Sequence, residues 1–424
     1  MLGFTQTQRA LYNRGQLPNP SLYSIGVNVP ADTRFRPALR MAQISPFRVM
    51  TVLERAKALE ALGRKIIHLE VGEPDFPTAA PIIEAGREAL AKGLTAYTPA
   101  AGLPQLRERI AQYYAQTQGV QISPQRILVT PGASGALSLL AQLLINPGDV
   151  VLMSDPTYPC NRHFVRLAGG IAQLVPVTAD TQYQLTPHLL APFAGSAVRG
   201  VWAASPGNPT GTVLDEEQLS ALAAWCEQQD AHFMVDEIYH GLDYAGGLSS
   251  ALKIAPDAIV VNSFSKYFGM TGWRLGWLVV PAALVPAANI LAQNLFIAAS
   301  TIAQHAALRA FDADTREILE ARRQAFAERR DFLSTVLKEL GFTVAVPTLG
   351  AFYIYAGIEK FSADCEHFCH VLLEDFGLAV TPGTDFGEYE SKRYVRFAFT
   401  TSLAELEIAA ERLRAAVASG KLSS

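Results

Sequence analysis

Charged residues and cysteines are scarce in this 424-residue sequence, and each shortage excludes a class of protein. Only 17% of the residues are charged and the net charge is −4 at pH 7, so nothing in the charge balance favours a nucleic acid as partner. Four cysteines in a chain of this length are too few and too scattered for a disulfide framework. The sequence therefore predicts a protein of a reducing, cytoplasmic setting.

Long uninterrupted apolar runs are also missing. Residues 275–308 contain no Asp, Glu, Lys or Arg, but prolines, amides and a histidine divide them. No stretch of about 20 apolar residues remains, which is the length that a membrane-spanning helix needs. We expect a buried helix at a core or subunit interface, and no membrane association. Polar and basic residues interrupt the N-terminus in the same way, so no secretory signal is expected there.

One short cluster has the residue types of a metal site. Cys365, His367, Cys369 and His370 lie close together in the sequence, but no second pair of ligands accompanies them. Structural zinc sites usually need four well-placed ligands. Because the surrounding apolar residues follow a helical period, we expect the cysteines to pack in a core and expect no metal.

Half of the residues are hydrophobic, which is enough for a large buried core, and their pattern indicates an α/β fold. Short apolar runs alternate with segments of helical period, which predicts a mostly parallel sheet flanked by helices. The expected strands are 66–71, 127–130, 150–154, 200–204, 233–235 and 258–261. The expected helices are 46–63, 80–91, 103–116, 134–144 and 215–228.

The C-terminal third has a different order of elements, typical of a smaller α+β domain. The expected elements there are a long helix over 314–340, strands over 342–346 and 351–355, a helix over 365–375, a strand over 394–398 and a closing helix over 404–416. The expected division of the chain is an irregular extension (1–40), a large domain (75–290), a connecting or interface segment (291–309) and a small domain (41–74 with 310–424).

Residues 263–277 hold one lysine, Lys266, and one arginine, Arg274, among hydroxyls, glycines and aromatic residues. A lysine that acts as a nucleophile needs a desolvated pocket or a neighbouring cation that lowers its pKa. Taken alone, the stretch fits a reactive lysine and an ordinary surface loop equally well.

Three further loops follow expected strands. Residues 130–136 place small residues at a helix start, where free N–H groups and the helix dipole attract an anion. Asn208 lies in a Pro-Gly-Asn-Pro turn, and Asp236 closes an apolar strand with Tyr239 three residues on. Each loop alone has a plain structural explanation, as a helix start, a turn or an exposed strand end.

Together these loops point to one ligand. Carboxyl ends of parallel strands gather at one edge of the sheet, so the cradle, amide, carboxylate, phenol, lysine and arginine should meet. A ligand with a phosphate, a ring nitrogen, a phenolic oxygen and an aldehyde would engage all of them. Pyridoxal phosphate has these groups.

The motif Ser263-x-Ser265-Lys266-x-x-Gly269-x-x-Gly272-x-Arg274 resembles the cofactor-lysine signature of the class I/II aminotransferases, in the aspartate aminotransferase superfamily of fold type I. The resemblance extends from about residue 41 to the C-terminus. It implies a large domain with a mostly parallel sheet, a smaller α+β domain and pyridoxal 5'-phosphate as cofactor.

The resemblance also implies roles for the residues at the cofactor. Lys266 would bond to the cofactor aldehyde and later carry the α-proton of the substrate. Asp236 would pair with the ring nitrogen, while Asn208 and Tyr239 would bind the ring oxygen. The residues implied to hold the phosphate are Ala133, Ser134, Ser263, Ser265 and Arg274.

Further positions match residues that contact the ring, the partner or the substrate. Tyr158 matches an aromatic residue that stacks on the ring. Tyr97 matches a tyrosine that reaches the phosphate of the neighbouring subunit, which implies a homodimer. Arg396 matches the arginine that binds the substrate α-carboxylate, with Gly72 and Asn208 beside it.

The implied activity is transfer of an amino group between an L-amino acid and a 2-oxo acid. Some aspartate-specific relatives have a lysine where this chain has Ser134, and others have an arginine within the region matching 275–308, where Asn294 lies. A second substrate carboxylate would therefore lack a cation, so an alanine-like, aromatic or broad specificity is expected. A carbon–sulfur lyase of the same fold is the alternative. A non-catalytic regulator is disfavoured, because residues 1–40 are too few for a DNA-binding domain and a linker.

Overall fold

The computed structural model describes residues 37–423, so the extension expected for residues 1–40 lies almost entirely outside the described residues. Residues 37–46 belong to one unit, in which the short 3-10 helix η2 spans Leu39–Gln43. The second unit begins at Phe47 and holds every candidate site residue.

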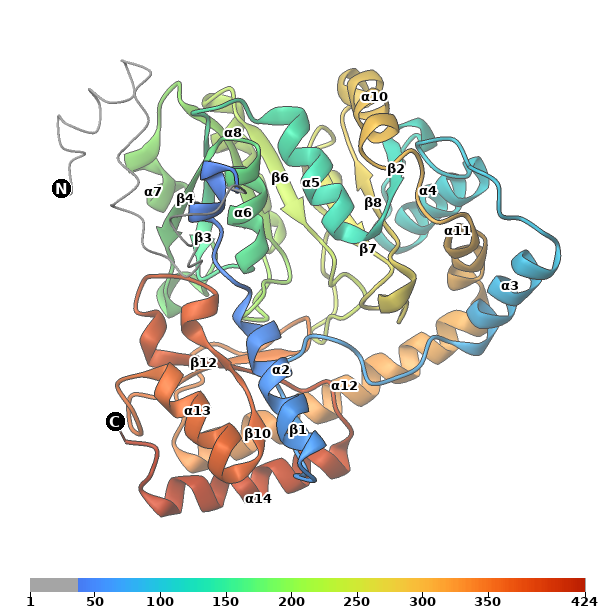
Figure 1. Ribbon diagram of the computed structural model, residues 1–424. Helices are drawn as coiled ribbons and strands as arrows, with labels where there is room; N and C mark the ends of the chain where they lie inside the picture. The colour runs from blue at the N-terminus through green and yellow to red at the C-terminus, as the bar shows by residue number, and fades with distance from the viewer. Residues whose placement is uncertain (1–36, 424) are drawn as a thin grey trace. The chain divides into compact units, whose positions relative to one another are not determined.

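A seven-stranded sheet lies at the centre of the second unit (Figure 1). The strand order is β2-β8-β7-β6-β5-β3-β4, and neighbours are parallel except where β8 runs against β2 and β7. The strands are β2 (Ile127–Thr130), β3 (Val150–Asp155), β4 (Ile171–Pro176), β5 (Val198–Ala204), β6 (His232–Asp236), β7 (Ile259–Ser263) and β8 (Gly276–Val279). The expected mostly parallel sheet is confirmed.

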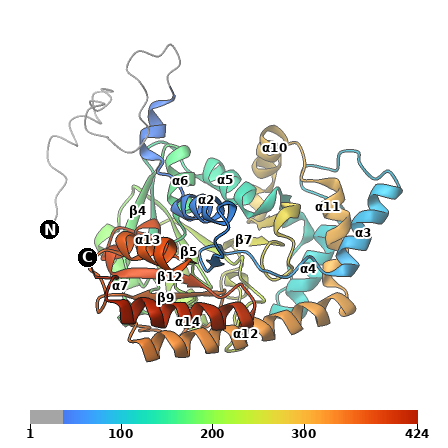
Figure 2. The same cartoon turned by 60° about the horizontal axis from the view of Figure 1, so that its bottom comes forward.

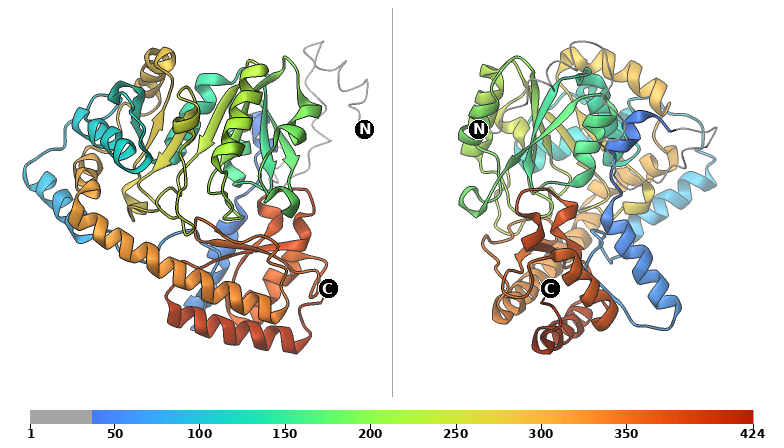
Figure 3. Two further views of the ribbon diagram at one scale, coloured as in Figure 1. Left: turned by 180° about the vertical axis from the view of Figure 1, so that it is seen from behind. Right: turned by 60° about the vertical axis from the view of Figure 1, so that its left-hand side comes forward.

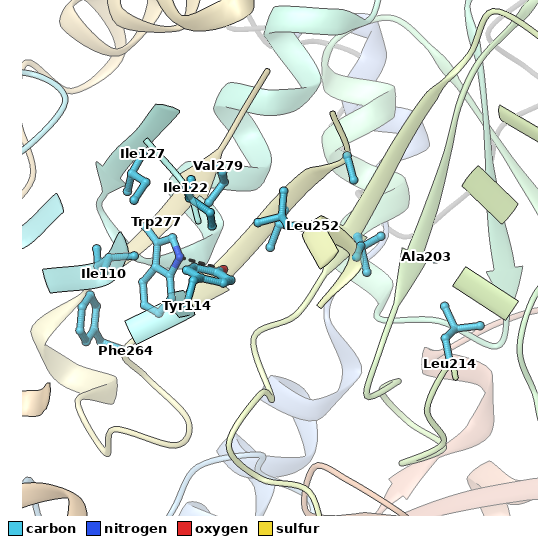
Figure 4. Packing of buried hydrophobic residues seen from close by; sticks show 14 of the residues in the cluster. Ile110, Tyr114, Ile122, Ile127, Ala203, Leu214, Leu252, Phe264, Trp277 and Val279 are labelled. Carbon is cyan, nitrogen blue, oxygen red and sulfur yellow. Dashed lines mark hydrogen bonds between the residues drawn. The ribbon is translucent and has the colours of Figure 1, made fainter. Parts of the chain in front are cut away.

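Alternate residues of these strands face two different hydrophobic cores, as the period of a strand requires. Leu152 of β3 packs in one core, whereas Val151 and Met153 pack in the other. The first core is covered by α4 (Pro104–Gln118), α8 (Glu216–Gln228) and α11 (Thr301–Ala307). The second core is covered by α5 (Gly132–Leu144), α6 (Pro159–Leu167) and α10 (Val285–Leu295). In Figure 4, the Trp277 indole of the first core donates a hydrogen bond to the Tyr114 hydroxyl, 3.2 Å away.

A smaller antiparallel sheet, in the order β11-β12-β9, belongs to a separate core. Its strands are β9 (Tyr353–Gly357), β11 (Thr381–Pro382) and β12 (Tyr394–Ala398), while β1 (Ile67–His68) pairs with β10 (Leu378–Ala379). The helices around them are α2 (Arg48–Ala61), α12 (Ala313–Leu340), α13 (Cys365–Phe376) and α14 (Leu403–Ser419). The long helix α12 lies alongside α14 and reaches α3 (Ala80–Ala91) beside the large sheet (Figures 2 and 3).

The structure corrects several sequence expectations. Residues 342–346 are not a strand, because only Thr343 forms an isolated bridge, to Gly357. The uncharged region 275–308 begins with strand β8 rather than with a helix, and β4 and α6 had not been expected. Helix α5 starts at Gly132, two residues earlier than predicted. The proposed domain boundaries stay a prediction.

The two cysteines of the suspected metal cluster and the uncharged region were expected to pack in the protein interior. Cys365 and Cys369 lie on the buried face of α13, in the core of the smaller sheet. Over residues 37–423, no helix combines the length and the apolar character needed to span a bilayer.

Candidate active site

Strand register brings the candidate loops to one edge of the large sheet. Thr130 at the end of β2 pairs with Gly276 at the start of β8, and Gly276 also pairs with Ser263 at the end of β7. On the other side of β7, Asp236 ends β6 and pairs with Ala204, which ends β5. The segments that contain Ser134, Lys266, Tyr239 and Asn208 therefore all leave the sheet at this edge.

Lys266 lies just after β7 and is partly buried. Its ammonium Nζ donates a hydrogen bond to the carbonyl oxygen of Gly72, 2.7 Å away. The same nitrogen lies 5.9 Å from the centre of the Tyr239 ring and 5.7 Å from that of Phe352. Burial, followed by the positive charge of Arg396, lowers the pKa of Lys266 to about 8. A neutral amine is therefore accessible near physiological pH.

Asp236 is the carboxylate of this edge, and its side chain is only 3% exposed. Its Oδ1 accepts a hydrogen bond from the backbone N–H of Ile238, at 3.1 Å. Burial raises the pKa of Asp236 to about 7, and the Ile238 N–H and the charge of Lys266 oppose this rise only in part. A buried acid of this kind is stabilised in its ionised form by a further positive partner.

An anion cradle forms where α5 begins. The first backbone N–H groups of an α-helix, here including that of Ala133, have no partner within the helix. Because no described side chain caps this helix, they can donate to a bound anion. An ideal Cβ on Gly132 would lie 2.5 Å from Nη2 of Arg274, so any side chain at residue 132 would displace the guanidinium from its position at the helix start. Ser134 is exposed in the first turn of the helix.

The two serines before the lysine belong to the same edge. Ser263 and Ser265 are buried, and the Ser263 hydroxyl accepts a hydrogen bond from the Ser265 backbone N–H at 3.0 Å. Ser263 lies opposite Gly276, and an ideal Cβ on Gly276 would be 2.8 Å from the backbone nitrogen of Ala133. The lysine loop and the start of α5 are therefore close neighbours.

Arg396 of β12 is almost fully buried. Its Nη1 donates to Oδ1 of Asn208 at 2.9 Å, and its Nη2 donates to the carbonyl oxygen of Glu70 and to the Thr381 hydroxyl. The guanidinium carbon lies 4.2 Å from the centre of the Tyr353 ring. Its Nε has no partner among the described residues, which leaves a buried donor available to an anion.

Tyr353 is a site residue that the sequence did not single out. Its hydroxyl is 2.9 Å from the hydroxyl of Tyr239, and it would lie 1.7 Å from an ideal Cβ on Gly72. Any side chain at residue 72 would displace it. Phe352, whose ring lies near Lys266, was missed as well. Both residues had been read only as part of an apolar strand.

Tyr158 belongs to this site, whereas Tyr97 does not reach it within one chain. Tyr158 is the N-cap residue of α6; burial raises the pKa of its phenol most, Cys160 raises it next, and Tyr353 and Asp236 make smaller contributions in the same direction. Tyr97 lies between α3 and α4 with 81% of its surface exposed.

Comparison with known proteins gives one consistent result. Residues 64–413 match the model of the family described as aminotransferase class I and II. A valine–pyruvate aminotransferase of Mycobacterium tuberculosis is 37% identical over 380 residues, which cover 89% of this chain and 97% of that protein. An aspartate aminotransferase of Geobacillus stearothermophilus is 34% identical over 387 residues, with 89% and 97% covered.

A solved structure agrees with these sequence matches. The crystal structure of an aminotransferase from Mycobacterium tuberculosis superposes with a TM-score of 0.88 at 37% identity, covering 91% of this chain and 100% of that one. The chain therefore belongs to the class I and II aminotransferases and is an enzyme that transfers amino groups.

Proposed function

We propose that the protein carries out this transfer at Lys266, with pyridoxal phosphate as the covalently bound cofactor. Its family uses this cofactor. The proposal depends chiefly on Lys266, whose amine has a lowered pKa and lies between the Gly72 carbonyl and two aromatic rings. An amine in this environment is suited to bond with an aldehyde and to accept a proton.

The donors and charges of the site fit the groups of pyridoxal phosphate. Asp236 would hold the positive ring nitrogen, which explains why a buried acid ends β6. Asn208 and Tyr239 would bind the ring oxygen, and Tyr158 would cover one face of the ring. The residues that would hold the phosphate are Ala133, Ser134, Ser263, Ser265 and Arg274. When bound, the cofactor supplies a ring that stabilises negative charge at the substrate α-carbon.

The chain's own residues account for binding and proton transfer. Arg396 binds the substrate α-carboxylate, because its planar guanidinium suits two oxygens and Asn208 fixes its orientation. The neutral amine of Lys266 accepts the α-proton and returns it to a neighbouring carbon. The rings of Tyr239 and Phe352 lie beside the amine and reduce its contact with water.

We infer an alanine-like, aromatic or broad range of amino donors rather than strict aspartate specificity. Ser134 is uncharged, and Asn294 is exposed on α10 with its amide donating to the Ile290 carbonyl oxygen. A second carboxylate would thus meet no cation from either position, and burying it would be costly. The relatives' names include both a valine–pyruvate and an aspartate enzyme, which is consistent with a family of varied donors.

We also infer a homodimer. Large apolar side chains are exposed on α3, on α10 and on the loops that follow these two helices, and exposed apolar surface of this kind is typical of an interface. These residues are Leu90, Leu94, Ile290, Leu295 and Ile297. The Thr301 hydroxyl donates to the Ala96 carbonyl oxygen at 2.7 Å, so the loop of Tyr97 lies against the start of α11.

The decisive variant is Lys266→Ala. We expect it to lower the transamination rate by at least about 100-fold, because it removes the proposed proton acceptor. The rate is measured with a panel of amino donors and 2-oxoglutarate, together with the change in cofactor absorbance when each donor is added. Lys338→Ala, at an exposed lysine of α12, is the matched control and should keep full activity.

Two outcomes would contradict the proposal. One is a Lys266→Ala protein that transaminates at the unmodified rate. The other is rapid release of pyruvate and ammonia from L-cystathionine when no 2-oxo acid has been added as amino acceptor, since that result would identify a lyase.

A further inference from the structure

Asp385 caps a helix that is distant in the sequence. Helix α2 starts at Arg48, and its N-cap residue Phe47 supplies no side-chain hydrogen bond. Oδ1 of Asp385 instead accepts a hydrogen bond from the Arg48 backbone N–H at 3.0 Å. Asp385 is only 2% exposed, and the Arg48 and Val49 backbone N–H groups both act on its carboxyl. The start of α2 is therefore fixed by a carboxylate more than 300 residues away.

The same residue also holds a second helix start. The backbone oxygen of Asp385 accepts a hydrogen bond from Nη2 of Arg162 on α6, at 2.9 Å. Arg162 is buried and lies one turn after Tyr158, the N-cap residue of α6. The next residue, Phe386, accepts a hydrogen bond from the backbone N–H of Thr157 at 2.9 Å. Asp385 and its neighbour thus fix the segment that carries Tyr158.

The two N-cap residues contact each other. The rings of Phe47 and Tyr158 have centres 5.9 Å apart and meet edge to face at 89°. Aromatic pairs in this geometry attract each other, but the contact depends on the placement of both helix starts. Asp385 binds both helices near their N-termini: its carboxylate accepts a hydrogen bond from α2, and its carbonyl oxygen accepts one from α6.

The surroundings of Asp385 connect this arrangement to the substrate. The charge of Arg396 acts on the Asp385 carboxyl, and the guanidinium of Arg396 lies 4.8 Å from the centre of the Phe386 ring. Phe386, whose carbonyl oxygen accepts the hydrogen bond of Thr157, therefore connects the segment of Tyr158 to the residue proposed to bind the substrate carboxylate. A shift of α2 would change the shape of this part of the site.

We propose that Asp385 is a positioning residue, which holds the start of α2 so that Phe47 packs against Tyr158 and closes one side of the substrate site. The inference rests on the proposed function, because Tyr158 is assigned to the cofactor ring there. Phe47 is then a residue that shapes the site from outside the large sheet. The contribution of Asp385 to substrate binding acts through Phe47.

A double-mutant cycle tests this dependence in the full-length holoenzyme. With the best amino donor of the panel, Asp385→Ala should raise KM about fivefold, the size expected from losing a helix cap, with a much smaller change in kcat. Phe47→Ala should raise KM by a similar factor. In the Phe47→Ala background, adding Asp385→Ala should change KM less than about twofold.

Hydrogen exchange supplies a readout that does not depend on activity. In the protein with or without cofactor, Asp385→Ala should speed amide exchange in residues 48–50 about tenfold. Asp385→Asn keeps an oxygen that accepts the Arg48 N–H, so it should restore the slow exchange. Phe47→Ala leaves the cap in place and should leave this exchange slow while KM rises.

The control removes a cap elsewhere. Asp215 caps α8 through a capping box, and Asp215→Ala should lower stability without changing KM. Equal KM factors for Asp385→Ala with and without Phe47 would overturn the proposal, as would unchanged exchange in residues 48–50. If Asp385→Ala fails to fold, an unchanged KM in Phe47→Ala overturns it. Failure of the proposed function is a separate result, because it would be seen as a Lys266→Ala protein that keeps its transaminase activity.

Discussion

The buried charge of Lys266 lowers the stability of the folded protein. Its pKa falls from the ordinary 10.5 to about 8, chiefly because burial disfavours the charged amine. Below pH 8 the amine is protonated in both the folded and the unfolded chain, so the folded state bears the full desolvation penalty. Between pH 8 and 10.5 the folded chain releases its proton first, and the penalty disappears as pH rises.

This penalty predicts that Lys266→Met stabilises the protein without cofactor. At pH 7 the free energy of unfolding should rise by roughly 2 kcal/mol, which is less than the full shift implies because Lys266 is only partly buried. The gain should shrink between pH 8 and about 10.5, where the unmodified protein recovers its stability. Thermal unfolding of both proteins at several pH values measures the difference.

The matched control is Lys338→Met on α12, where the lysine is exposed and stability should change little. A Lys266→Met protein that is less stable than the unmodified protein at pH 7 would contradict the prediction. Active-site residues often lower stability, so replacing one commonly stabilises a protein while it removes activity.

At the scale of elements, the anion cradle depends on how closely α5 and the Arg274 turn approach. Gly132 begins α5 with a φ of +69°, and an added Cβ would meet the Arg274 guanidinium. Gly132→Ala should therefore push the arginine away and weaken binding of pyridoxal phosphate at least about tenfold, because charge-assisted hydrogen bonds to phosphate are lost. Titration of cofactor-free protein with pyridoxal phosphate, followed by absorbance, measures the affinity.

A second glycine separates this effect from backbone strain. Gly119 ends α4 with a φ of +66°, and nothing lies within 4 Å of its ideal Cβ. Alanine in this backbone region costs about 1 kcal/mol at either residue. Gly119→Ala should lose that stability and keep its affinity for the cofactor. Equal cofactor affinities in the two variants would refute the cradle.

The elements that the sequence predicted correctly are those with a strong local pattern. Strands β5, β6 and β7 are buried apolar runs between turns, and α12 keeps a helical period over 28 residues. Strand β8 has only four residues inside an uncharged region, and its antiparallel place between β2 and β7 comes from pairing rather than from local sequence. Such pairings join residues that are far apart in the chain, so the local hydrophobic period does not predict them.

The site residues also differ in whether a local sequence pattern or a distant contact reveals them. Lys266 and Asp236 stand out because a charged residue follows an apolar strand. Tyr353 and Asp385 act through contacts with Gly72 and Arg48, which are hundreds of residues away in the chain. An aromatic residue in a strand or an acid in a turn is ordinary by itself, so neither carries a signal that the sequence alone could reveal.

At the scale of the whole molecule, the exposed Tyr97 predicts a test of the proposed homodimer. If Tyr97 of one subunit completes the site of the other, Tyr97→Ala and Lys266→Ala damage different parts of each site. A mixed dimer of the two variants then contains one undamaged site, formed by Lys266 of the Tyr97→Ala subunit and the intact Tyr97 of its partner.

Equal amounts of the two variants, unfolded together and refolded, should therefore recover activity that neither has alone. Random pairing gives half mixed dimers with one intact site each, so about a quarter of the unmodified activity is expected. Refolding each variant separately and mixing afterwards is the control, and it should recover nothing while the subunits do not exchange. No recovery after joint refolding, with mixed dimers confirmed by mass spectrometry, would show that Tyr97 does not complete the site of the partner subunit. The exposed apolar residues of α3 and α10 would then need a different explanation.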